Sequence, residues 1–318
     1  MFASLLPPCP TRCSRIIACV VSSLICLSSF ALQTDQEHSL ISVVDGNGLL
    51  KEIGPLPPHI KEASGLEITG AKHLWTHNDG GVPALYCLDT LGNLVRALQL
   101  NHRNSGWEDL TVDKKGNLYI GAIGNNNNDK RQLSIYKIPD PEKLTDPVVT
   151  GEIIHFTYED QRDFPPSPPH RNFDADAFIA RGDSLFIFSK NRTSPFTGYT
   201  KIYRLPQQAG SYQAILSDSI FLGNGSILDN AVTAAALSPD GGTLALLSHR
   251  CVWLIKDFNG SKFSSGKIVR VNLHHFSHKA GMCFSGETRL LIVDELEFNM
   301  IGGKLYSIDL QKISINPQ

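Results

Sequence analysis

Short hydrophobic runs separated by polar turns make up most of the sequence after residue 60. Residues 107–121, WEDLTVDKKGNLYIG, contain two such runs on either side of a turn that ends in Gly-Asn. Runs rich in β-forming residues that flank a turn of this kind are typical of a β-hairpin. Residues 133–139, LSIYKIP, add a third run with a central aromatic residue. The pattern therefore predicts a unit of three antiparallel strands.

The same order of runs occurs five times along the chain. The other four units begin with EASGLE (62–67), FDADAF (173–178), VTAAAL (232–237) and KAGMCF (279–284). A fourth run follows each of the first four units, and residues 40–53 form a spare strand-like segment near the N-terminus. Each first strand contains one hydrophobic anchor, and these anchors are Leu66, Leu110, Phe178, Leu237 and Met282.

Repeated four-stranded units of about 40 to 50 residues are typical of a β-propeller. A helical period of about 3.6 residues is nearly absent from the repeat region. We therefore predict an all-β fold, a β-propeller with five blades by repeat count, in a ring that the N-terminal strand closes. A sixth, degenerate blade within residues 140–170 is the alternative.

The N-terminus differs from the repeats. Arg12 and Arg15 precede an apolar run that ends with the small residues Ser29 and Ala31 on either side of Phe30. This pattern predicts a signal peptide over residues 1–31, followed by a single domain over residues 32–318. We expect a secreted or periplasmic protein, or a membrane-anchored one if the signal is not cleaved. The remainder of the sequence contains no run of about 20 apolar residues that would cross a bilayer.

The charge balance limits the range of partners. The 318 residues have a formal net charge of −2, without a basic stripe or an acidic tail. This balance argues against nucleic acid and against an anionic membrane surface. We expect a monomer that binds a small molecule or a protein at one face of the propeller. The three cysteines beyond the signal segment, Cys87, Cys251 and Cys283, lie in or beside strand-like runs, which predicts buried free thiols.

Acids and amides recur at equivalent positions of the repeats. In a propeller the first strands line the central channel, and we expect the second-strand ends to surround one of its mouths. Calcium takes roughly six to eight oxygen ligands from carboxylate, amide and backbone groups. The cofactor hypothesis is therefore a calcium ion at this mouth, with the candidate ligands Glu62, Asn78, Glu108, Asn125 and Asp176. The alternative for each acid is a hydrogen bond to the backbone of a neighbouring blade.

Candidate catalytic residues lie at the same ends of the predicted second strands. His77 and Asp79 are candidate general bases, and Lys190 is a candidate that also balances the acidic charge. His249 occupies a corresponding place in the fourth unit. The sequence contains no GxSxG, HExxH, P-loop or dinucleotide-binding motif.

The ordered motifs EASGLE, LWTHNDGG, WEDLTVD, LYIGAIGNN, NFDADAF, LFIFSKNR and KIYRLP resemble a set of uncharacterised secreted bacterial propeller proteins. The resemblance covers roughly residues 60–310. That set is distantly similar to the SdiA-regulated and phytase-like esterase families, and to calcium-dependent lactonases of the gluconolactonase type. The lactonase resemblance implies a metal held by Glu, Asn and Asp residues of the channel. This chain departs from the set at Ala122, Ala235 and Ala280, where the set has polar residues.

Two functions are consistent with these features. The first is a module that binds a ligand or a protein, with a calcium site at the channel mouth. The alternative is a metal-dependent hydrolase of ester, lactone or phosphate bonds, in which a cation polarises the substrate and activates water. The three alanines at channel positions favour the binding module.

Overall fold

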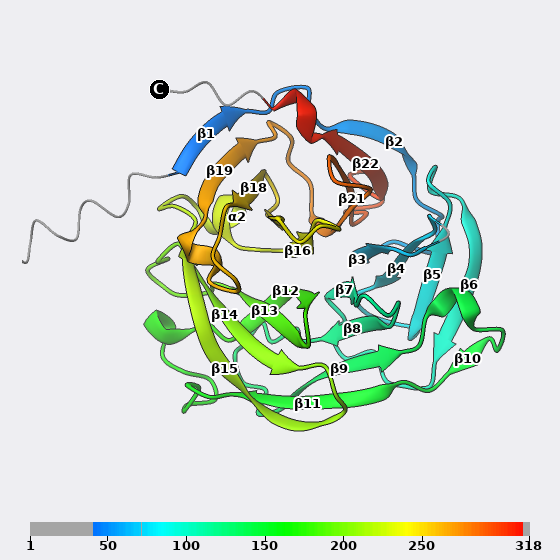
Figure 1. The fold of residues 1–318 in the computed structure, drawn as a ribbon, viewed down its shortest axis with the longest axis horizontal. Coiled ribbons are helices and arrows are strands. Elements are labelled where there is room, and N and C mark those ends of the chain that lie inside the picture. The colour runs from blue at the N-terminus through cyan, green and yellow to red at the C-terminus, as the bar shows by residue number, and fades with distance from the viewer. Residues whose placement is uncertain (1–40, 71, 314–318) are drawn as a thin grey trace, which may run out of the picture. The chain divides into compact units, whose positions relative to one another are not determined.

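The computed structural model describes residues 41–70 and 72–313. The predicted signal peptide, residues 1–31, lies outside the described residues. The regular secondary structure of the described chain is almost entirely β-strand. Its sheets are arranged around a common centre, with β3, β7, β12 and β16 nearest to that centre (Figure 1). The predicted all-β, propeller-like arrangement is therefore confirmed.

The strands of the first repeat form one sheet that they share with no other complete repeat. Its strands pair in the order β3 to β6, and a two-residue strand from a later connection adds to the outer edge. The bounds are β3 (Ala63–Ile68), β4 (Leu74–Asn78), β5 (Ala84–Leu88), β6 (Leu94–Leu100) and β10 (Val148–Val149).

The second and third repeats share one eight-stranded sheet, because their outermost strands β11 and β15 pair in parallel. The second repeat contributes β7 (Asp109–Val112), β8 (Leu118–Ala122), β9 (Leu133–Ile138) and β11 (Glu152–Tyr158). The third repeat contributes β12 (Asp174–Arg181), β13 (Ser184–Lys190), β14 (Tyr199–Pro206) and β15 (Gly210–Phe221). The described chain thus has four hydrogen-bonded sheets for five sequence repeats.

The N-terminal segment contributes a strand to each of the last two sheets. In one sheet, β1 (Ile41–Asp45) pairs in parallel with β19 (Lys267–Asn272), beside β18 (Cys251–Lys256), β17 (Thr243–Leu247) and β16 (Ala234–Leu237). In the other, β2 (Lys51–Pro55) pairs with β22 (Lys304–Asp309), beside β21 (Arg289–Asp294) and β20 (Lys279–Phe284). The segment over residues 40–53, predicted as one strand, is therefore two strands, and only β2 joins the sheet of the C-terminal strands.

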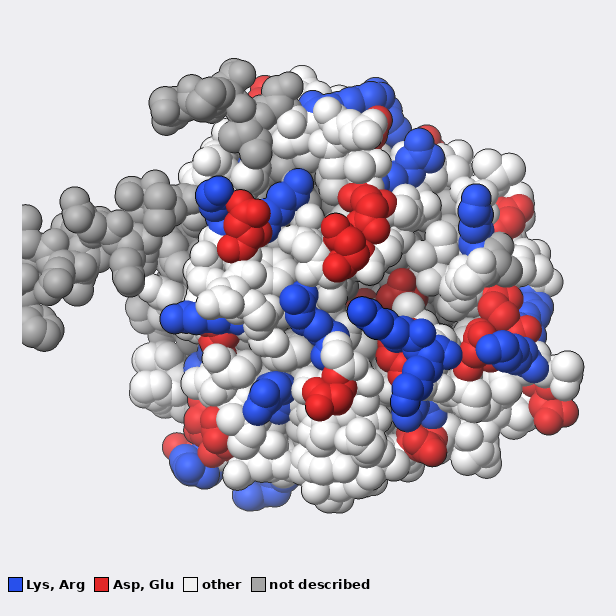
Figure 2. Space-filling view, in the orientation of Figure 1, with Lys and Arg blue, Asp and Glu red and all other residues white. Residues whose placement is uncertain are grey.

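Helical structure is minor among the described residues. It comprises the one-turn helix α2 (Ile227–Asn230) and the 3-10 helices η1 (Pro141–Lys143), η2 (Pro168–His170), η3 (Phe263–Ser265) and η4 (Leu310–Lys312). None of these helices is long or apolar enough to cross a membrane. On the face that Figure 2 presents, acidic and basic side chains are interspersed.

The hydrophobic core lies between neighbouring repeats. Tyr119 of β8 and Phe178 of β12 belong to one buried cluster, and Phe186 of β13 and Trp253 of β18 belong to the next. Burial of large aromatic side chains between sheets supplies much of the stability of such folds. The three cysteines outside the signal segment are buried free thiols, as predicted.

One carboxyl group joins three of the inner strands at the axis. Asp109 is fully buried, and its side-chain oxygens accept hydrogen bonds from the backbone N–H groups of Leu110 (2.9 Å), Phe178 (3.2 Å) and Ala235 (3.3 Å). Phe178 lies in β12 and Ala235 in β16. Burial raises the pKa of Asp109 well above its usual range, and the backbone hydrogen bonds oppose this rise. The inner strands therefore share a polar link as well as their hydrophobic contacts.

We expect Asp109→Ala to lower the free energy of unfolding by about 3 kcal/mol, because it leaves the N–H groups of Phe178 and Ala235 without acceptors at a cost of about 1 to 3 kcal/mol each. Urea denaturation measures this loss. The control is Asp183→Ala, which removes an exposed side chain that bonds only Ser184 and should change the stability by less than about 0.5 kcal/mol. Equal losses in the two variants would contradict the proposed role of Asp109.

Candidate functional site

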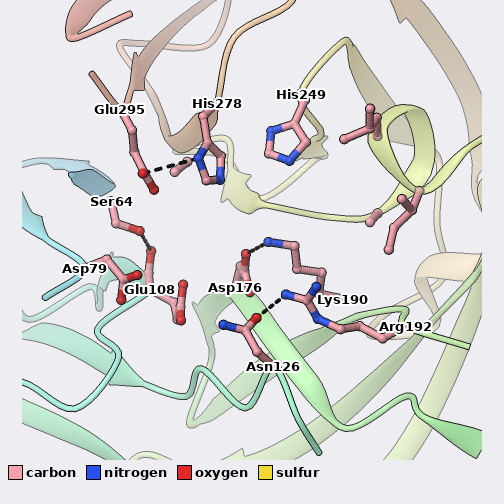
Figure 3. Close-up of a pocket in the computed structure, with 14 residues that line it drawn as sticks. Ser64, Asp79, Glu108, Asn126, Asp176, Lys190, Arg192, His249, His278 and Glu295 are labelled. Atoms are coloured by element: carbon pink, nitrogen blue, oxygen red, sulfur yellow. Dashed lines mark hydrogen bonds and ion pairs between the residues drawn. The ribbon is translucent and has the colours of Figure 1, made fainter. Parts of the chain in front are cut away.

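A cavity of about 380 Å³ lies where the starts of the inner strands meet the ends of the second strands. All five repeats contribute side chains to its wall. Figure 3 shows its polar residues, which are Ser64, Asp79, Glu108, Asn126, Asp176, Lys190, Arg192, His249, His278 and Glu295. Ile227, Leu228, Ala231 and Ala280 complete the wall with apolar surface.

Backbone bulges in the inner strands help to form this wall. The strand register shifts between Ala175 and Ala177 in β12, and between Lys279 and Gly281 in β20. A bulge leaves one residue without a partner on the neighbouring strand and redirects its side chain. The residue is Asp176 in the first case and Ala280 in the second, and both line the cavity.

The two cationic side chains that the third repeat contributes to the wall both have acidic partners. Lys190 ends β13 and donates its Nζ to Asp176, with each side chain about nine-tenths buried. Burial raises the pKa of Asp176 to about 6 although Lys190 opposes the rise. Burial lowers the pKa of Lys190, but the charges of Asp176 and Asp174 outweigh this effect and raise it. Arg192 donates Nε to Asp174 Oδ2 at 2.5 Å and also binds Asn126.

Asp79 and Glu108 lie together on another part of the wall (Figure 3). Among the described residues, neither carboxyl group has a hydrogen bond or an ion pair. Only 9% of Glu108 is exposed. Burial raises the pKa of Glu108 well above its usual range, and the charges of Asp176 and Asp79 add to this rise. Burial, followed by the charges of Glu295 and Glu62, raises the pKa of Asp79 to about 6.

The two histidines in the wall have pKa values shifted in opposite directions. His278 Nδ1 lies 3.2 Å from Glu295 Oε2, and this hydrogen bond raises the pKa of His278. His249 is 9% exposed, and its Nδ1 has no hydrogen-bond partner within the described chain. Burial lowers the pKa of His249 to about 3, so its ring is neutral at physiological pH.

Lys279 connects the loop that contains His249 to the loop that contains His275. It is fully buried, and its Nζ donates hydrogen bonds to the backbone oxygens of His249 (2.9 Å) and His275 (3.0 Å). Burial lowers the pKa of Lys279 to about 8. This lysine therefore links the loop after β17 to the loop before β20, and the hydrophobic pattern alone does not reveal that role.

The structure places the five candidate calcium ligands in different surroundings, although Glu108 and Asn125 both line a second, neighbouring pocket. Glu108 and Asp176 line the cavity, whereas Glu62 is exposed and does not line it. The Asn78 side chain accepts from Glu62 N and donates to His59 O, both at 3.0 Å. The Asn125 side chain donates to Phe173 O and accepts from Lys130 N, again at 3.0 Å. Within residues 41–70 and 72–313, no group of three or more His, Cys, Asp or Glu residues is arranged to hold a metal ion.

The candidate catalytic residues are also separated. Asp79 and Lys190 line the cavity, but His77 is fully buried outside its wall. His77 Nδ1 lies 3.1 Å from Asn78 O, its ring meets Trp107 edge-on, and burial lowers its pKa to about 4. Asp79, one position beyond the end of β4, is the residue of this segment that reaches the cavity.

Some wall residues were missed by the sequence prediction. Arg192 lies two positions beyond the end of β13, and Asn126 lies four positions beyond the end of β8. Their positions just beyond the ends of second strands are the sequence signal that points to both residues. Helix α2 lies in a long connection without repeat spacing, so no sequence signal places Ile227 and Leu228 at the cavity.

No protein-family model matches this sequence, and no curated protein sequence matches it significantly. Solved structures with similar folds include a virginiamycin B lyase from Staphylococcus aureus (14% identity, TM-score 0.40, covering 80% of this chain and 68% of that one). The PQQ-bound aldose sugar dehydrogenase from Streptomyces coelicolor has 8% identity and a TM-score of 0.45, with 84% and 99% of the two chains covered. The Cps50 (Swd1) β-propeller domain of Myceliophteria thermophila has 8% identity and a TM-score of 0.41, with 82% and 99% covered. These similarities are too low to indicate an activity.

We expect Asp79→Asn to raise the melting temperature at pH 7 by roughly 2 to 4 °C. The pKa of Asp79 is about 4 in the unfolded chain and about 6 in the folded protein, so between these pH values the folded protein binds more protons. The free energy of unfolding therefore falls as the pH rises from about 4 to about 6. Asparagine removes this penalty. Thermal unfolding between pH 4 and pH 7 should show the gain at pH 7 and little gain at pH 4, while the control Asp183→Asn should show none at either pH. A gain that does not depend on pH would contradict this explanation.

Proposed function

We propose that this protein is a small-molecule-binding β-propeller whose ligand occupies the cavity of about 380 Å³. The observation that carries the proposal is a largely buried polar side chain without a partner in its wall. Glu108 is 9% exposed, lines the cavity, and its carboxyl group has no hydrogen-bond partner among the described residues. Most buried polar groups in folded proteins are hydrogen-bonded, so the free Glu108 carboxyl group favours a ligand that completes it.

The composition of the wall also supports a ligand site. Concave sites that combine a few convergent polar groups with apolar surface are the usual small-molecule sites of proteins. Groups with strongly shifted pKa values tend to gather at functional sites, and Asp79, Glu108, Asp176 and His249 all have such shifts. A ligand enclosed by all five repeats is therefore favoured over a protein partner on the outer loops.

We propose that the ring has five blades. The eight-stranded sheet contains two inner strands, β7 and β12, so it is best described as two four-stranded blades whose outer edges pair through β11 and β15. The pairing of β2 with β22 supports a ring that the N-terminal segment closes. Export to a secreted or periplasmic location stays a prediction of the sequence.

The hydrolase alternative also stays a prediction. Asp79 is the candidate base that lines the cavity, while His77 does not reach it. No contact among the described residues favours turnover over binding, so we retain binding as the proposal.

Binding at this cavity has a direct test. A library of small polar compounds is screened by thermal unfolding of the wild-type protein and of Ala280→Leu, which places a larger side chain in the cavity wall. A ligand at a hundredfold excess over its dissociation constant stabilises the native state by about 2.7 kcal/mol, or roughly 5 to 10 °C for a domain of this size. We expect such a shift to disappear in Ala280→Leu and to persist in Ala209→Leu, which alters an exposed loop residue. Hits that bind Ala280→Leu equally well would contradict the assignment of the cavity.

Calcium binding can be tested separately. Lys190 already supplies a positive charge to Asp176, so we expect the wild-type melting temperature to be the same in calcium and in chelator. Removing that charge in Lys190→Met should make the stability depend on calcium, because it leaves a buried carboxylate uncompensated. A calcium-dependent rise in the wild-type protein that is lost in Asp176→Asn would instead support the calcium site predicted from the sequence.

A further inference from the structure

Most charged side chains of the cavity wall form ion pairs, and the exceptions are the neighbouring acids Asp79 and Glu108. Lys190 pairs with Asp176, Arg192 with Asp174, and His278 with Glu295. Each of these three basic groups therefore has an acidic partner, and the ring of His249, the remaining basic side chain of the wall, is neutral. Asp79 and Glu108 are the lining acids left without one among the described residues. The unmet interaction of the cavity is consequently with a cation and not with an anion.

The chain around Glu108 is adapted to hold its carboxyl group in this place. A Cβ atom on Gly124 would lie 1.9 Å from Glu108 Oε1, so only glycine at position 124 leaves room for the carboxyl group. Ser64 Oγ donates a 2.6 Å hydrogen bond to the backbone oxygen of Glu108 and ties this segment to the first repeat. Figure 3 shows the Asp79 and Glu108 side chains next to each other on the wall. Gly124 and Ser64 therefore favour this position of the Glu108 side chain.

The cavity also has an apolar part. Ile227 and Leu228 of α2 line it and are each 39% exposed, and the small side chains of Ala231 and Ala280 lie in the same wall. Exposed branched aliphatic side chains in a ligand cavity gain free energy when a hydrocarbon group covers them. A ligand that satisfies both parts of the cavity carries a positive charge at one end and a hydrocarbon group at the other.

We propose that the ligand is a primary amine in its ammonium form with a short hydrocarbon chain. This inference rests on the proposed function, since it names the ligand class of the same cavity. The ammonium group donates hydrogen bonds to the carboxyl groups of Asp79 and Glu108, and the hydrocarbon chain packs against Ile227 and Leu228. An ammonium has three donors, and charge-assisted bonds to carboxylates are stronger than bonds between neutral groups. Two free carboxyl groups suit such a ligand better than calcium, which takes roughly six to eight oxygen ligands.

The test compares n-hexylamine with 1-hexanol, which has a similar length but no charge, by isothermal titration calorimetry at pH 7. We expect the amine to bind at least about tenfold more tightly than the alcohol, which corresponds to about 1.4 kcal/mol. Glu108→Gln and Asp79→Asn should each weaken amine binding by about tenfold or more and leave alcohol binding unchanged. The matched control Asp240→Asn removes an acid in an exposed turn and should leave both affinities as in the wild-type protein.

A second variant separates the hydrocarbon contact from the charge. Leu228→Ala should weaken the binding of hexylamine more than that of methylamine, because methylamine has no chain to reach α2. Glu108→Gln keeps the shape of the side chain and removes only its ionisable group, and its thermal unfolding verifies that the variant is folded.

Equal binding of hexylamine and hexanol, or amine binding that survives both carboxyl substitutions, would overturn the inference. Failure of both compounds to bind would also overturn it. If other compounds then bind the wild-type protein and not Ala280→Leu, the proposed function stands and only the ligand class is wrong. If no compound distinguishes these two proteins, the proposed function fails as well.

Discussion

The carboxyl group of Asp109 is the interaction on which the centre of the molecule depends. The inner strands of a ring of sheets bring backbone N–H groups to the axis, where no neighbouring strand is close enough to accept all of them. A buried N–H group without an acceptor costs free energy comparable to a lost hydrogen bond. Asp109 accepts from β12 and β16 while it belongs to β7, so a single side chain satisfies donors from three inner strands. These bonds oppose the burial penalty of Asp109 only in part, because its pKa stays well above the usual range.

The cavity follows from the same geometry. Inner strands that converge on an axis place their starting residues close together, and the second strands return to the same end. Polar residues at these positions therefore gather from all five repeats, although they are far apart in the sequence. Bulges at Asp176 and Ala280 turn individual side chains toward the cavity. The wall is thus a consequence of strand convergence combined with local breaks in strand pairing.

Stability and binding make opposite demands on this cavity. Asp79 and Glu108 are held without partners in a largely desolvated place, which disfavours their charged forms. Buried groups of this kind reduce the stability of the ligand-free protein, and they are retained where a site needs them. Asp176, by contrast, has Lys190 as a partner inside the fold. The two sides of the cavity therefore differ in whether the protein or a ligand completes the interaction.

The sequence by itself determined the all-β class, the five repeats and the strand runs, because the alternation of side chains along a strand and the chemistry of turns are local properties. It also placed Glu108, Asp176, Asp79 and Lys190 at strand ends that face one end of the axis. Only the tertiary structure decided that Asn78 and Asn125 bind backbone groups and that His77 is buried against Trp107. It likewise decided that β11 pairs with β15, and that Lys190 and Arg192 form ion pairs with the two acids of β12, Asp176 and Asp174. Those outcomes depend on contacts between residues distant in the chain, and spacing within one repeat carries no information about them.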